Sequence, residues 1–266
     1  MKIFIFFIII SIAINAEEFA TPLEGIIKPV YQAKISMSTE GKAEKILLKE
    51  GSKVRKGEVI LSLDSALQRI ETRRRKLLVE DTIKRDSLQK NLKILKDILD
   101  KRQELYDATK SISANELNQL KMQYINTEAE LEATIINDKK ELIEYEISKK
   151  ILETYDLRAP VNGIITRIEP KIGEWVQMGK EIVEIVNTDV CFVEIDLTAK
   201  EFQSVSVGSK VKLKIFNGRD TFIRAGKIKF ISTVADSSSR LIRSKIEFDN
   251  KDGKAIPGLS AELILK

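Results

Sequence analysis

The stretch between Gly57 and Pro160 contains neither Gly nor Pro, and this gap constrains the fold of the chain more than any other feature. Gly and Pro destabilise a helix interior by about 1 and 3 kcal/mol, whereas Leu, Ile, Lys, Glu and Gln, which fill this stretch, favour helix. A serine-containing break at 108–113 divides the stretch. The sequence therefore predicts two antiparallel helices, at about 65–107 and 113–155, each about 60 Å long at 1.5 Å per residue.

The second predicted helix begins with a capping signal, and both helices carry apolar heptads. Ser113 precedes the helix, and Glu116 follows three residues later, which is the pattern of a capping box. Polar residues interrupt the heptads at Asp81, Arg85, Glu128 and Asp138, which favours a two-helix hairpin over a long dimeric zipper. The predicted seam residues are Leu78, Leu88, Leu92, Leu95, Leu99 and Tyr106 in the first helix, and Leu117, Tyr124, Leu131, Ile135, Leu142, Tyr145 and Leu152 in the second.

A glycine repeat flanks this helical stretch. Gly41, Gly51 and Gly57 precede it, and Gly163, Gly173 and Gly179 follow it with the same spacings. In each copy a Val lies three residues after the middle Gly, at Val54 and Val176. Glycines at fixed offsets between short apolar runs indicate turns with positive φ between strands. We therefore expect two similar β layers that pack face to face, one before the helices and one after them.

The remainder of the chain has the pattern of short strands. Turn signals at 205–208, Asn217-Gly218, Asp249-Asn250 and Asp252-Gly253 separate alternating apolar segments. Asn-Gly in particular suits a tight hairpin. The tail is predicted to form a small barrel or sandwich.

Composition excludes several classes of chemistry. The chain of 266 residues has no His and one Cys, Cys191, so it can form neither a His-dependent nucleophile pair, nor a zinc or iron–sulfur cluster of cysteines, nor an intramolecular disulfide. We predict no enzyme activity, no cofactor and no metal site. The formal charge of +5 is the small difference between 45 Lys+Arg and 40 Asp+Glu, and no basic stripe with interleaved aromatics is present, so we predict no nucleic-acid partner.

The N-terminus resembles an export signal. Lys2 precedes an apolar run at 3–14, and Ala16 offers a small residue for cleavage, so residues 1–16 are predicted to be a signal peptide and 17–33 an N-terminal segment. The run is too short to cross a hydrocarbon core of about 30 Å, although an uncleaved short anchor remains the alternative. A lipoprotein would need a Cys at the cleavage site, and the single Cys of the chain lies at position 191, which argues against a lipoprotein. We expect a protein of a bacterial periplasm.

The order of these features resembles a known family. Gly-x-x-Val-x-x-Gly followed by apolar residues, in two halves separated by helices, with Leu157-Arg158-Ala159-Pro160 opening the second half, looks like the split biotinyl/lipoyl-like domain of HlyD-type membrane fusion proteins. These are the periplasmic adaptor subunits of tripartite efflux pumps. The tail, including Gly208, Gly226 and 248–259, resembles the β-barrel domain of these adaptors.

The resemblance implies an elongated α+β fold. A long antiparallel α-helical coiled-coil hairpin would be inserted in the split lipoyl-like domain, followed by the small β-barrel. The expected parts are the first half of the lipoyl-like domain at 34–64, the hairpin at 65–155, the second half at 156–188 and the barrel at 189–266. A further membrane-proximal domain of the family looks missing.

The resemblance also implies partners and tip residues. The expected partners are an inner-membrane transporter of the RND type, with which the protein would associate at the membrane, a TolC-like outer-membrane channel, and copies of the same chain in a ring. In drug-efflux adaptors an Arg, a Leu and a Ser at the hairpin tip engage the channel. This chain has Arg102, Tyr106 and Ser113 at that spacing, with Leu105 beside the tyrosine.

Three alternatives remain open at this point. A true lipoyl or biotinyl carrier needs a modifiable Lys at the tip that joins the halves, but this chain has Asp64-Ser65-Ala66 there, which argues against a carrier. The second alternative is a structural periplasmic coiled-coil protein without a transport role. The third is an adaptor of an ABC-type export system.

Overall fold

The structure is a computed structural model that describes residues 23–218 and 220–265. The chain divides into two compact units. The first comprises the chain up to Gln32 and from Asn187 onward, and the second comprises Ala33–Val186. The predicted signal peptide at 1–16 and most of the predicted N-terminal segment lie outside the described residues. Within the described ranges, none of the helices combines the length and the hydrophobicity that a membrane span requires.

The first unit is a β-barrel with one short helix. Its strands, in order around the sheet, are β1 (Leu23–Ser36), β12 (Ser260–Ile264), β9 (Lys210–Asn217), β10 (Asp220–Ile231), β11 (Ile242–Asp249) and β8 (Glu181–Leu197), and β1 also pairs with β8. The end of β1 from Ala33 and the start of β8 up to Val186 belong to the second unit, where β8 pairs with residues 164–168. Buried Val193 and Ile195 on β8, and Ile246 and Phe248 on β11, alternate with more exposed neighbours, as expected for strands with one face in a core. Helix α4 (Ala199–Ser204) begins with a capping box formed by Thr198 and Glu201.

The predicted turn at Asn217-Gly218 joins two strands of this barrel. β9 and β10 pair antiparallel from Asn217 and Asp220 onward, and Gly218 has a φ of +66°. The barrel therefore confirms the strand pattern predicted for the tail.

The second unit contains strands from both copies of the glycine repeat. They are β2 (Gly41–Ile46), β3 (Lys53–Val54) and β4 (Val59–Leu63) before the helices, and β5 (Asp156–Arg158), β6 (Gly163–Ile168) and β7 (Trp175–Val176) after them. One four-stranded sheet has the order β5-β4-β2-β7, and β3 pairs with β6. Gly41 lies opposite Val176, and their equivalents in the other copy, Gly163 and Val54, also lie opposite each other. The two halves thus exchange strands and share one core.

The glycines of the repeat have two different roles. Gly51, Gly57, Gly173 and Gly179 have φ between +77° and +93°, which confirms the predicted turns. The first glycine of each copy has no positive φ and begins a strand instead, at Gly41 for β2 and at Gly163 for β6.

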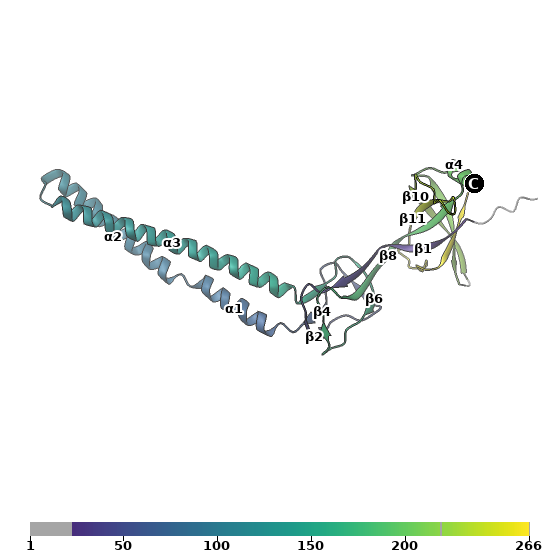
Figure 1. Ribbon diagram of the computed structural model, residues 1–266, viewed down its shortest axis with the longest axis horizontal. Coiled ribbons are helices and arrows are strands. Elements are labelled where there is room, and N and C mark those ends of the chain that lie inside the picture. The colour runs from purple at the N-terminus through teal and green to yellow at the C-terminus, as the bar shows by residue number, and fades with distance from the viewer. Residues whose placement is uncertain (1–22, 219, 266) are drawn as a thin grey trace, which may run out of the picture. The chain divides into compact units, whose positions relative to one another are not determined.

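Three helices form an antiparallel hairpin in the second unit. They are α1 (Ala66–Glu80), α2 (Ile83–Thr109) and α3 (Ala114–Glu153), and Figure 1 shows α1 and α2 following one another along α3. Arg85 pairs with Asp138, and Arg102 near the end of α2 lies close to Glu116 at the start of α3, so the two arms run in opposite directions.

The single first helix predicted at 65–107 is wrong, because it is interrupted at Asp81 and Thr82. Asp81 adopts an extended ψ of 99°, and its carboxylate accepts a hydrogen bond from the backbone N–H of Ile83 at 3.2 Å. The Thr82 hydroxyl donates to Asp86 at 2.9 Å. Short polar side chains that bond to nearby groups compete with helical hydrogen bonds, so they end a helix without Gly or Pro.

The interior of the hairpin differs between its two parts. Along α2 the predicted seam residues Leu88, Leu92, Leu95 and Leu99 are half-buried, as are Tyr124 and Leu131 opposite on α3. The seam between α1 and α3 contains more polar side chains, although the predicted seam residues Tyr145 and Leu152 are half-buried there. Leu78 and Leu142, predicted in the seam, are exposed.

Polar groups take the place of those leucines between α1 and α3. The Gln68 amide donates to the Ser148 carbonyl at 3.0 Å, and the Thr72 and Ser148 hydroxyls lie 2.9 Å apart. Arg75 lies 3.7 Å from Glu141 and from Glu144.

Candidate functional site

The tip of the hairpin is a short turn fixed by its own side chains. Helix α2 ends at Lys110, whose backbone is left-handed (φ 55°) and whose N–H donates to the Tyr106 carbonyl at 3.1 Å. The Thr109 hydroxyl donates to the Leu105 carbonyl at 2.9 Å and lies 2.6 Å from the Ser111 hydroxyl. These hydrogen bonds stabilise the turn without a glycine at the helix end, where one is common.

Ser113 is the N-cap of α3, as predicted. Its hydroxyl oxygen accepts a hydrogen bond from the backbone N–H of Asn115 at 3.2 Å, and its carbonyl accepts from Leu117. The predicted capping box would bond Ser113 to Glu116. That box is wrong in detail, since the serine bonds to Asn115 and the Glu116 carboxylate lies 3.6 Å from the Arg102 guanidinium.

The other predicted tip residues lie on α2 in different environments. Arg102 is about half exposed beside Glu116, and Leu105 is exposed. Tyr106 is half-buried, and the Lys110 ammonium lies 4.3 Å from the centre of its ring. Leu105 is therefore a large apolar side chain that is accessible at the tip.

A groove beside the tip contains residues that the sequence patterns did not single out. It has a volume of about 290 Å³, and its lining includes Ile98, Arg102, Ile112, Glu116 and Leu117. Ile112 and Leu117 are buried. In the sequence, Ile112 is the single apolar residue in the otherwise polar stretch 109–113. Its position there is the feature from which burial of the Ile112 side chain could have been predicted.

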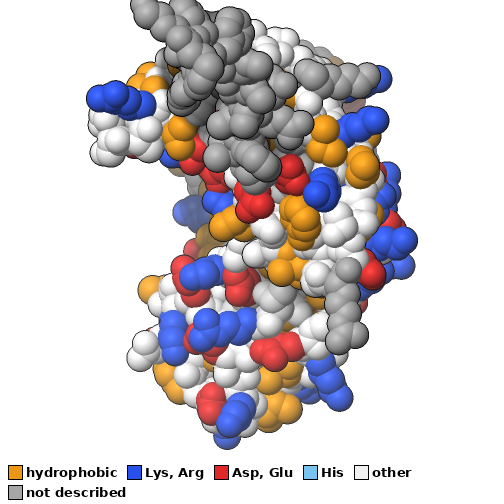
Figure 2. All heavy atoms as spheres, turned by 90° about the vertical axis from the view of Figure 1, so that its right-hand side faces the viewer, with side chains coloured by type: hydrophobic (Ala, Val, Ile, Leu, Met, Phe, Trp, Pro, Cys, Tyr) orange, Lys and Arg blue, Asp and Glu red, His pale blue; other side chains and the backbone are white. Residues whose placement is uncertain are grey.

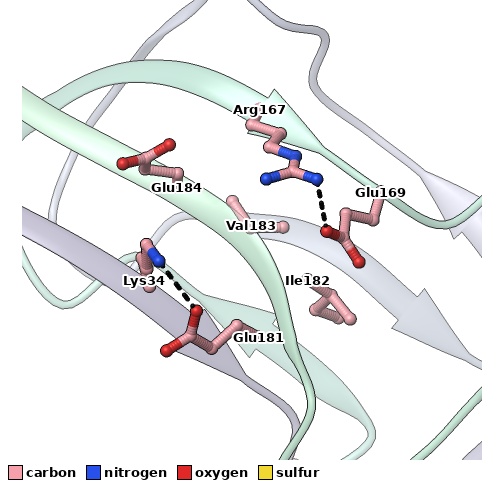
Figure 3. A pocket seen from close by; sticks show the side chains of 7 residues that line it. All are labelled: Lys34, Arg167, Glu169, Glu181, Ile182, Val183 and Glu184. Carbon is pink, nitrogen blue, oxygen red and sulfur yellow. Dashed lines mark ion pairs between the residues drawn. The ribbon is translucent and has the colours of Figure 1, made fainter.

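The hollow in the strand-exchanged part of the second unit is too small for a substrate. Figure 3 shows Lys34 directed towards Glu181 and Arg167 towards Glu169, with distances of 3.1 Å and 2.7 Å. The hollow measures about 20 Å³, which accommodates about one water molecule. Four of its charged groups form these two ion pairs.

The titratable groups with shifted pKa values fit structural roles. Burial raises the pKa of the Cys191 thiol, which lies in the barrel core, and a buried thiol of this kind is inert. Hydrogen bonds from Arg74 and Arg75 lower the pKa of Glu71 to about 2, so this carboxylate on α1 stays ionised. Among the described residues, no three Asp, Glu or Cys side chains form a group that could hold a metal ion.

Surface charge is mixed on the face that Figure 2 presents. Lys and Arg side chains there are interspersed with Asp and Glu side chains. Proteins that bind nucleic acid present a continuous basic surface, which the described residues on this face do not form.

Curated relatives match most of this chain, which covers about half of their length or less. No family model matches. An uncharacterized protein from Haemophilus influenzae is 24% identical over 242 residues, which are 90% of this chain and 55% of the relative. The cobalt-zinc-cadmium resistance protein CzcB from Cupriavidus metallidurans is 23% identical over 220 residues, which are 82% of this chain and 39% of CzcB.

Solved structures share the fold at low sequence identity. The crystal structure of MacA from Actinobacillus actinomycetemcomitans superimposes with a TM-score of 0.75 at 17% identity, covering 91% of this chain and 78% of MacA. The membrane fusion protein Spr0693 from Streptococcus pneumoniae gives a TM-score of 0.55 at 15% identity, covering 93% of this chain and 99% of Spr0693. The predicted resemblance is confirmed: the described chain has the fold of the membrane fusion proteins, the periplasmic adaptors.

Proposed function

We propose that this protein is a non-enzymatic periplasmic adaptor that links an inner-membrane transporter to a TolC-like outer-membrane channel. The observation that supports this function best is the insertion of a helical hairpin between two β halves that exchange strands. At its tip, the hairpin exposes the Arg102 and Leu105 side chains in a turn held by hydrogen bonds. Such a tip suits protein contact rather than chemistry on a substrate.

The parts of the chain have different roles in this proposal. Signal-directed export delivers the chain to the periplasm, where the barrel contacts a transporter of the RND type and the strand-exchanged unit packs with other copies into a ring. The hairpin reaches towards the channel, and α3 alone, with 40 residues, is about 60 Å long. The cargo passes through the assembly, and the protein supplies connection without a cofactor.

The tip residues engage the channel through complementary chemistry. The Arg102 guanidinium offers forked donors to carbonyl or carboxylate oxygens of a channel helix. Leu105 supplies the apolar contact, because Tyr106 is turned inward under Lys110. Ser113 keeps the start of α3 in place beside them.

The test is a charge reversal at the tip. In a strain that depends on this protein for efflux, Arg102→Asp is expected to abolish resistance while the protein level stays unchanged. Lys90→Asp, a reversal at an exposed position about 18 Å from Arg102 along the same helix, is the matched control and should leave resistance intact. Resistance that survives Arg102→Asp would contradict the tip assignment.

A second variant separates a partner contact from the ion pair within the chain. Arg102→Glu combined with Glu116→Arg restores an ion pair between α2 and α3 but removes the arginine from its own position. If Arg102 contacts the channel, this double variant stays inactive. Full activity would mean that Arg102 serves only to pair with Glu116.

A further inference from the structure

Helix α1 turns its polar side towards α3 and its apolar side away from it. Gln68, Thr72 and Arg75 make the seam contacts. At 100° per residue, the apolar side chains point roughly 150° away from that seam. They are Leu67, Ile70 and Leu77, each 60% to 84% exposed. This arrangement is the reverse of an amphipathic helix that packs on its own hairpin partner.

Helix α3 has a matching apolar stripe on its outer side. Ile136, Ile143, Ile147 and Ile151 are 44% to 55% exposed. They point roughly 100° away from the seam contacts Glu141, Glu144 and Ser148 by the same arithmetic. Ile143, Ile147 and Ile151 line a shallow groove of about 630 Å³. Both helices of this part of the hairpin therefore expose an apolar stripe outside the seam, whereas the contacts named within the seam are polar.

The two stripes lie at the same heights along the hairpin. Ile70 lies between Gln68 and Thr72, which both bond to Ser148, and Ile147 is the neighbour of Ser148. Leu77 follows Arg75, which reaches Glu141 and Glu144, and Ile143 lies between these two glutamates. In the same way Leu67, next to Gln68, is within one turn of the level of Ile151.

We propose that these stripes are the two sides of one contact between neighbouring copies of this chain, in which α1 of one copy packs antiparallel against α3 of the next. Copies in a closed ring are related by rotation without a shift along the axis, so side chains at equal heights meet. Leu67 then meets Ile151, Ile70 meets Ile147, and Leu77 meets Ile143. The setting of this contact, a ring of adaptors, rests on the proposed function.

Charged residues beside the stripes are also complementary to those of a second copy of this chain. Arg73 lies at the height of Glu146, and Glu80 at the height of Lys139. Helical geometry places Arg73 and Glu80 on the flank of the α1 stripe that faces Glu146 and Lys139 in an antiparallel contact. Among the described residues, neither Arg73 nor Glu146 has an ion-pair partner in its own chain. Contact with a second copy covers both apolar stripes and pairs the charged residues beside them. An unrelated partner bound to one stripe would leave the other stripe exposed.

The direction of the stripes favours a curved array of copies. In a cross-section of the hairpin, a line joins the axes of α1 and α3. Neither stripe points straight outward along this line, and both point towards the same face of the hairpin. A row of hairpins joined edge to edge in this way bends consistently towards that side. Heterologous contacts that bend in this way close into a ring when the rotation between neighbouring copies closes, and form an open filament otherwise.

The test is cross-linking between two single-cysteine variants of the exported full-length chain. Ile70→Cys and Ile147→Cys proteins are mixed and treated with a short bismaleimide, to which the native Cys191 is inaccessible because it is fully buried. A mixed dimer is expected in severalfold excess over the product from either variant alone. A chain with both substitutions should give a ladder of oligomers.

The matched control moves the second cysteine to a different level along α3. Met122 is as exposed as Ile70 but lies about 37 Å from Ile147 along α3, so Ile70→Cys mixed with Met122→Cys should give no dimer above background. Equal yields from the two mixtures, or no Ile70–Ile147 product, would overturn the proposal. Circular dichroism checks that each variant keeps its helices.

Charge reversal adds a rescue experiment and separates this inference from the proposed function. Arg73→Glu in the Ile70→Cys chain should lower the yield, and Glu146→Arg in the Ile147→Cys chain should restore it. If resistance requires Arg102 but the cross-link never forms, the inference alone fails. If the ladder forms but Arg102→Asp has no effect on resistance, the proposed function fails and the contact stands.

Discussion

Single residues of the glycine repeat differ in how much space surrounds them. A Cβ added to Gly163 would lie 2.7 Å from the Val186 carbonyl oxygen and 2.8 Å from Ile185, whereas a Cβ on its equivalent, Gly41, would first meet Leu63 at 3.4 Å. The repeat therefore predicts the position of both glycines, but only packing shows which one excludes a side chain. In the sequence the two are indistinguishable.

We expect Gly163→Ala to destabilise the protein by about 1–3 kcal/mol, because the added methyl group meets backbone that cannot move aside. Gly41→Ala should change the free energy of unfolding by less than about 0.5 kcal/mol, since its neighbour is a side chain at contact distance. Denaturant unfolding of both variants measures the difference. Equal effects would contradict the close approach of β6 and β8 at Gly163.

At the scale of elements, the sequence predicted α2 and α3 better than α1. Heptad leucines at Leu92 and Leu99 identified the seam of α2 correctly, because there the apolar face covers the hairpin partner. In α1 the same reasoning placed Leu78 inside, and it is exposed. Periodicity shows that a helix has an apolar face, but it does not say which neighbour covers that face.

The helix break and the tip show the same limit. The break at Asp81 and Thr82 carries no Gly or Pro, so local side-chain hydrogen bonds had to be seen to locate it. At the tip, the cap at Ser113 followed from sequence, whereas the inward position of Tyr106 and the approach of Glu116 to Arg102 depend on the angle at which the two helices meet.

The polar seam between α1 and α3 predicts a specific coupling. Thr72 and Ser148 are buried and bonded to each other, so Ser148→Ala alone should cost about 1–2 kcal/mol by removing a partner of the Thr72 hydroxyl. Adding Thr72→Val should cost less in the Ser148→Ala background than alone, because both polar groups are then absent. A double-mutant cycle by thermal unfolding measures the coupling energy. Additive effects would contradict a shared hydrogen bond, and Thr127→Val, which bonds only within α3, is the control.

At the scale of the whole molecule, the hairpin is an insertion into a unit whose two halves depend on each other. β2 pairs with β7 and β3 with β6, so each half contributes strands to the other, and one core contains side chains of both. The ends of the hairpin meet on neighbouring strands, since Ser62 lies opposite Asp156 and the Leu63 N–H donates to the Tyr155 carbonyl at 2.8 Å. The unit should therefore fold without its helices, although neither half should fold alone.

Excision of the hairpin tests whether the β strands fold without the helices and whether the helices are needed for function. Replacing residues 64–154 by Asn-Gly joins β4 to β5 through a tight turn, which suits two antiparallel neighbouring strands. The shortened chain should lose most of its helical circular dichroism, keep a cooperative thermal transition, and fail to support resistance, because nothing then spans the distance to the channel. Truncation before β5, which removes the second half, is the matched control and should abolish cooperative unfolding of the remaining half. A shortened chain that is unfolded would show that the helices are needed to bring the halves together, and one that still supports resistance would contradict a spanning role for the hairpin.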